Sequence, residues 1–85
     1  MNIFFIERYI EKIKKEDIYN YAHTQGINLT NQELDTLYSY LKNYHKVFLR
    51  NKETRPKLLN EIKSKVSLPV ANKLDELYNT YKDII

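Results

Sequence analysis

Apolar residues recur at intervals of three and four positions along most of the chain, and strict alternation of apolar and polar residues is nearly absent. Intervals of three and four place side chains on one face of an α-helix, whereas alternation is typical of strands. The apolar stripe of the first segment consists of Ile3, Ile6, Ile10 and Ile13. With Asn2 in position to cap it, the pattern predicts a helix over residues 3–14.

The second segment is shorter and ends at the single glycine of the chain. Ile18 and Ala22 lie one helical turn apart, and Gly26 follows where a left-handed residue commonly terminates a helix. These signals predict a helix over residues 16–25.

The third segment opens with the clearest local signal of the sequence. Thr30 and Glu33 form a capping-box pattern, in which each side chain satisfies a backbone N–H group at the helix start, and Leu29 stands where a hydrophobic staple begins. One apolar face then continues through Leu34, Leu37, Tyr38 and Leu41. We expect this helix to run over residues 31–44.

A helix-turn-helix motif is an alternative for the second and third segments, because Ala22 and Gly26 have the spacing of that motif. In that alignment, however, the positions that should be buried fall on the polar residues Gln25, Gln32 and Asp35. The interval before the next helix is also longer than the tight turn of the motif. We therefore expect a plain helical hairpin.

The two prolines mark the starts of the last two helices. Pro56 suits the first turn of a helix over residues 55–66, and Ser67 with Pro69 suits the start of a final helix that follows its apolar period to Ile84. No repeat, linker or low-complexity tract interrupts the 85 residues. The sequence predicts an all-α fold, a single small bundle of about five short helices that forms one domain over residues 1–85.

A basic stretch lies in the middle of the chain. Residues 42–65 carry eight Lys and Arg residues against two Glu residues, a local net charge of +6 where the whole chain has +3. Together with nearby aromatic residues this charge could bind the phosphates and bases of a nucleic acid. The candidate contacts are Lys42, Lys46, Arg50, Lys52, Arg55 and Lys57.

A structural explanation competes with binding for the same stretch. The sequence divides it into the end of a helix near Tyr44, an apolar plug at residues 47–49 where the chain crosses over, and a cationic start of the helix at Pro56. Lys42 and Lys46 would then suit the negative end of a helix dipole. The other cations of the stretch have no structural role that the sequence reveals.

The first helix offers a second candidate surface. Phe4, Phe5 and Tyr9 lie beside the isoleucine stripe and make its apolar face wide for a small bundle to cover. Core filling is the default explanation for such residues. If they stay uncovered, we expect them to form a protein-interaction or self-association face.

The residue inventory argues against catalysis. The chain has no cysteine, its two histidines, His23 and His45, have no metal-ligand spacing, and no serine lies in a nucleophile elbow. Adjacent acids such as Glu16 and Asp17 diverge by about 100° on a helix instead of converging on a substrate. We therefore expect no enzymatic activity, no metal and no cofactor.

The cellular location is predicted from the lack of a signal peptide, of a membrane-spanning stretch and of cysteine. The apolar run at residues 3–6 ends at Glu7 and Arg8 without a cleavage site, so we expect no secretory signal. No apolar stretch reaches the roughly 18 residues that a membrane span requires. A cysteine-free chain also agrees with a reducing compartment, and we expect a cytoplasmic protein without a membrane partner.

The order of these features resembles a known family. The segments "YA" with "GINLT", then "KLLNEI", then an S-x-P helix start ending in "LDELYNTY" are similar to short uncharacterised proteins of low-GC Gram-positive bacteria, classed as a domain of unknown function. The similarity covers residues 10–83. It implies an all-helical cytoplasmic fold with no established activity. The segment "FLRNKETRP" departs from the acidic helix start usual in such relatives, so a partner that reads this region need not be shared.

Two hypotheses of function result. The first is a non-catalytic protein-interaction module whose partner is another protein or a second copy of the chain, as in a homodimer. The alternative is weak nucleic-acid binding through residues 42–65.

Overall fold

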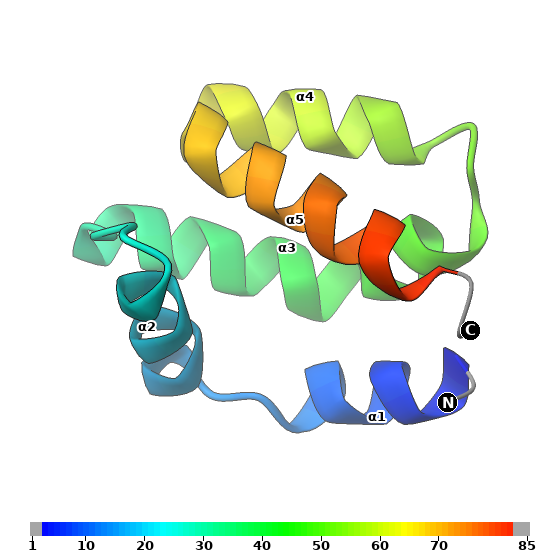
Figure 1. Cartoon of the computed structure of the whole chain (residues 1–85), viewed down its shortest axis with the longest axis horizontal. Coiled ribbons are helices and arrows are strands. Elements are labelled where there is room, and N and C mark those ends of the chain that lie inside the picture. The colour runs from blue at the N-terminus through cyan, green and yellow to red at the C-terminus, as the bar shows by residue number, and fades with distance from the viewer. Residues whose placement is uncertain (1–2, 83–85) are drawn as a thin grey trace.

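The computed structural model describes residues 3–82, which fold into five α-helices without a strand (Figure 1). The helices are α1 (Ile3–Lys12), α2 (Lys15–Thr24), α3 (Asn31–Arg50), α4 (Arg55–Lys65) and α5 (Leu68–Tyr81). This confirms the all-α bundle expected from the periodicity. The proposed Asn2 cap and the continuation of the last helix to Ile84 lie outside the described residues.

Helix α3 is the axis of the bundle. In Figure 1, α1 lies along one side of α3, and α4 and α5 lie on the other side as an antiparallel pair. Helix α2 packs against the first turns of α3, where Lys15 pairs with Asp35 at 2.8 Å. The three segments that flank α3 are therefore held together mainly through it.

The core is small and lies between α2, α3, α4 and α5. Its buried apolar residues are Ile18, Ala22, Leu29, Leu37, Leu58, Ile62, Val70 and Ala71. Leu37 and Ile62 are the most deeply buried of them. Helix α1 contributes no apolar residue to this buried set among the residues described; its isoleucines are half-buried.

The local signals for helix ends are confirmed. Thr30 Oγ1 accepts from the Glu33 N–H at 3.1 Å, and a Glu33 carboxylate oxygen accepts from the Thr30 N–H at 2.9 Å. Gly26 has a positive φ of 78°, which an L-residue rarely adopts, and ends α2. Ser67 caps α5 through the Val70 N–H at 3.3 Å. Each of these devices depends on residues within a few positions of one another.

The burial pattern of α2 and α3 does not fit the helix-turn-helix alignment, and Figure 1 shows α2 lying across the first turns of α3 and not antiparallel along it as in the expected hairpin. The polar residues that a helix-turn-helix alignment would bury, Gln25, Gln32 and Asp35, are exposed. Leu29, in the connection between the two helices, is buried instead. The connection between the two helices is therefore held by Leu29, whose side chain packs in the core.

The prediction that the third helix ends near Tyr44 is wrong. Helix α3 continues to Arg50, so residues 47–49 are its last turns and not a plug in a crossover. Nothing between Tyr44 and Arg50 breaks a helix, and the inward stripe simply continues through His45 and Phe48. The break comes at Asn51, whose side-chain oxygen accepts from two backbone N–H groups of the following turn at 3.0 Å each.

A helix that crosses a membrane must be both long and apolar. Across residues 3–82, no helix is both long and apolar enough to cross a membrane.

Candidate functional site

A buried carboxylate lies at the centre of the inward face of α1. Glu7 is 4% exposed and sits inside the isoleucine stripe, at the position nearest α3. Its two carboxylate oxygens accept from Nε and Nη2 of Arg50, at 2.6 and 2.9 Å. A buried charge is tolerated when it is paired in this bidentate way, so Arg50 is what allows Glu7 to lie at a helix interface.

The electrostatics of this pair favour both charged forms. The hydrogen bond from Arg50 lowers the pKa of Glu7, burial opposes this effect, and the positive charges of Arg50 and Lys46 add to it. The same hydrogen bond raises the pKa of Arg50. Glu7 is therefore a carboxylate at neutral pH and serves as an anchor rather than as a proton donor.

One turn further along, the contact between α1 and α3 is repeated in weaker form. Glu11 approaches Lys46 at 3.8 Å, and Lys42 donates to the backbone oxygens of Ile10 and Glu11 at 2.8 and 2.6 Å. Lys42 thus satisfies carbonyl groups at the C-terminal end of α1, where a cation also suits the helix dipole. We call the pairs Glu7–Arg50 and Glu11–Lys46 together with the Lys42 bonds the α1–α3 clasp.

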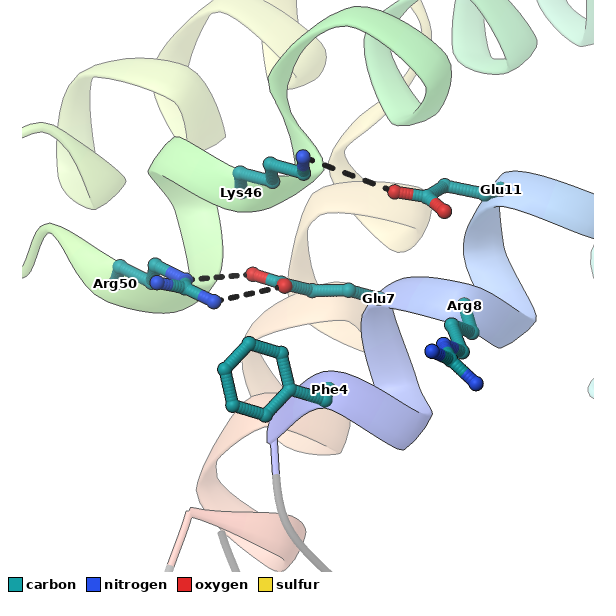
Figure 2. Close-up of a pocket in the computed structure, with 6 residues that line it drawn as sticks. All are labelled: Phe4, Glu7, Arg8, Glu11, Lys46 and Arg50. Atoms are coloured by element: carbon teal, nitrogen blue, oxygen red, sulfur yellow. Dashed lines mark hydrogen bonds and ion pairs between the residues drawn. The ribbon is translucent and has the colours of Figure 1, made fainter.

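An open pocket of about 300 Å³ lies over the clasp. Figure 2 shows Glu7 and Arg50 facing each other across it, with the ring of Phe4 beside Arg50 and the side chain of Arg8 projecting away from them. The Phe4 ring centre is 5.3 Å from the Arg50 guanidinium carbon, within the range of a cation–π contact. The charged groups of the pocket chiefly partner one another, which leaves little polarity aimed at a ligand.

Besides Glu7, His45 is the other buried polar residue in the described part of the chain, and it lies on α3 near the α1–α3 clasp. It is 7% exposed, and its Nδ1 lies 2.9 Å from the carbonyl oxygen of Leu41. Since a carbonyl only accepts, Nδ1 carries a proton. Nε2 has no hydrogen-bond partner and lies 3.6 Å from a carboxylate oxygen of Glu11. This contact could not be predicted from the sequence, because Glu11 and His45 lie on different helices.

Arg55 holds three helices together. Its Nε and Nη2 donate to the carbonyl oxygens of Phe48 and Leu49, at 2.7 and 3.3 Å, at the end of α3. Its guanidinium carbon lies 3.6 Å from the ring centre of Tyr78 on α5. Tyr78 in turn meets Phe48 edge to face, with 6.0 Å between ring centres. Arg55 therefore joins the first turn of α4 to the ends of α3 and α5.

The structure gives contacts within the fold to four of the six cations proposed as nucleic-acid contacts. Lys42, Lys46 and Arg50 contact α1, whereas Arg55 contacts α3 and α5. Within the described part of the chain, Lys52 and Lys57 have neither an ion-pair partner nor a side-chain hydrogen bond. Four of the six thus have structural roles that the sequence does not reveal, and nucleic-acid binding itself stays a hypothesis.

The three aromatic residues proposed as a self-association face lie on two different sides of α1. Phe4 turns toward Arg50, at the edge of the clasp. Phe5 and Tyr9, one turn apart, are 65% and 66% exposed on the side of α1 away from Glu7. Arg8 and Lys12 are exposed on the same side. We call Phe5, Arg8, Tyr9 and Lys12 the outward face of α1.

Metal chemistry finds no support in this geometry. Among residues 3–82, no three His, Asp or Glu side chains gather in a way that could hold a metal ion.

The chain was compared with protein-family models, with curated proteins and with solved structures, and none of the three comparisons gave a match. The resemblance to a family of uncharacterised bacterial helical proteins therefore stays a prediction.

Proposed function

We propose that the protein is a non-catalytic protein-interaction module, and that its contact surface is the outward face of α1. The observation that carries this proposal is the exposure of Phe5 and Tyr9, two large aromatic side chains one turn apart with about two thirds of their surface in solvent. Aromatic residues and arginine are enriched at protein interfaces and dominate their binding energy. An aromatic pair flanked by Arg8 and Lys12 has this composition.

The way α1 is fixed supports the same proposal. The α1–α3 clasp uses Glu7 and Glu11, so both acids of α1 are directed at α3. A helix fixed by charge pairs on one side can present its other side rigidly, which lowers the entropic cost of binding. In this view the clasp explains why α1 needs a buried glutamate where an isoleucine would otherwise fit.

Capture from a lysate of the source cells tests the proposal. Wild-type protein, Phe5→Ser and Tyr9→Ser would each be immobilised, with Lys57→Ser as a control that changes an exposed residue on α4. We expect the same bound protein with wild type and Lys57→Ser, and loss of that protein with both aromatic variants. Circular dichroism would show that the variants are folded, as expected for exposed positions.

Sedimentation of the purified chain covers the case in which the partner is a second copy. A homodimer that Phe5→Ser and Tyr9→Ser dissociate would also support the proposal. A chain that stays monomeric at high concentration and retains no partner through Phe5 and Tyr9 would overturn it.

A further inference from the structure

The outward face of α1 carries positive charge and no acid. Arg8 and Lys12 flank Phe5 and Tyr9, whereas Glu7 is buried against Arg50 and Glu11, at the edge of the face, is directed at Lys46. A charge segregation of this kind selects among partners, because like charges repel and opposite charges attract across a contact.

A second copy of this chain does not complement that face. Two outward faces packed together would bring two Arg8 and two Lys12 side chains into one contact, while the acids of α1 are directed at Arg50 and Lys46. Such an arrangement is unfavourable, since buried or half-buried like charges oppose association. The geometry disfavours a symmetric dimer through α1.

From the charge and the aromatic pair together, we infer that the outward face of α1 binds an acidic amphipathic helix of another protein. The inference rests on the proposed function and specifies the partner. Apolar side chains of that helix would pack on Phe5 and Tyr9, and its Asp or Glu residues would flank them to meet Arg8 and Lys12. A partner segment of about 10 to 12 residues would match α1 in length, at 1.5 Å per residue.

The size of the surface sets the strength of the contact. One face of a three-turn helix is smaller than a standard interface, so the complex is a transient one in which charge makes a large contribution to specificity. Added salt would weaken it, because Arg8 and Lys12 are solvent-exposed and screened.

Three fluorescently labelled helical peptides test the inference with the intact chain. They share length and leucine anchors at helical spacing, and their remaining positions carry mainly Glu, Gln or Lys. We expect the Glu peptide to bind at least about tenfold more tightly than the Gln peptide, which corresponds to about 1.4 kcal/mol. We expect no binding of the Lys peptide, and loss of the Glu preference at high salt.

Matched variants assign the binding to the outward face. Replacing Arg8 and Lys12 together by Gln should bring the affinities for the Glu and Gln peptides together, whereas Lys57→Gln should leave them unchanged. Phe5→Ser should weaken both peptides. A perturbation of backbone amide signals confined to α1 would support the same location.

Several results would overturn the inference. These are equal binding of the Glu and Gln peptides, no binding of the Glu peptide, insensitivity to the Arg8 and Lys12 substitutions, or a preference for phosphatidylserine vesicles or a single-stranded oligonucleotide. A homodimer through Phe5 and Tyr9 would also overturn it. In that case, or if capture from lysate depends on Phe5 and Tyr9 while the Glu peptide fails, the proposed function stands and only the partner class is wrong.

Discussion

Replacing Arg55 tests whether the basic stretch holds the fold together. Arg55→Met keeps an unbranched apolar stem at this position but removes the charge, the two hydrogen bonds to α3 and the stacking on Tyr78. Lys57→Met removes the same charge from an exposed position of the same helix. A comparison of the two separates the contacts of Arg55 from the general effect of lowering the net positive charge.

The magnitude follows from the contacts. The 2.7 Å bond from a charged donor to Phe48 O contributes about 1.5 kcal/mol, and the 3.3 Å bond to Leu49 O contributes less. Stacking on Tyr78 adds about 0.5 to 1 kcal/mol. Since such contributions overlap, we expect Arg55→Met to lower the free energy of unfolding by about 2 kcal/mol and the melting temperature by about 8 to 16 °C.

Urea denaturation followed by circular dichroism provides the measurement. Arg55→Lys should fall between wild type and Arg55→Met, because lysine keeps the charge and loses the planar fork and the stacking. Lys57→Met should lie within about 0.5 kcal/mol of wild type. If Arg55→Met and Lys57→Met are equally stable, with unchanged dependence on urea, then the contacts of Arg55 do not stabilise the fold and the reasoning is wrong.

Three further predictions concern the clasp and the alternative function. Because the pKa of Glu7 is lowered in the folded state, its stabilisation is complete above the ordinary glutamate pKa of about 4.5 and is lost as the pH falls below it. Glu7→Gln should therefore be less stable than wild type at pH 7 by chemical denaturation, and the difference should shrink as the pH falls below 4.5; a difference independent of pH would contradict the pairing. Long-range ¹H–¹⁵N spectra at pH 8 should show His45 protonated on Nδ1, since that atom faces a carbonyl oxygen; an imidazole that carries its proton on Nε2 and none on Nδ1 would refute the geometry. Labelled DNA and RNA titrated at low salt should not bind, because four of the six candidate cations already have partners in the fold. Binding at low salt that weakens strongly when salt is added would instead favour the nucleic-acid hypothesis.

The fold could be predicted where its determinants are local. The Thr30–Glu33 capping box, the left-handed Gly26 and the Ser67 cap each involve residues within three positions of one another, and each is observed as expected. Helical spacing likewise identified all five helices. The error at the end of α3 arose because residues 47–49 were interpreted as an apolar plug in a crossover, although no residue of this segment ends a helix.

The clasp could not be predicted in the same way. Glu7 and Arg50 lie 43 positions apart, and nothing in a single sequence shows which cation reaches which acid. One signal was present: Glu7 stands within the isoleucine stripe, and a charged residue on an apolar face requires a partner. The exposure of Phe5 and Tyr9 also depends on how α1 rotates about its axis, which the position of Glu7 fixes.

Site-specific photo-crosslinking tests most directly whether the outward face of α1 is the contact surface. A benzophenone side chain would replace Tyr9 in one protein and Lys57 in another, both exposed in the structure. After irradiation in a lysate of the source cells, we predict a discrete covalent adduct from position 9 and none from position 57. An adduct from position 57 alone would contradict the account and return attention to the basic stretch.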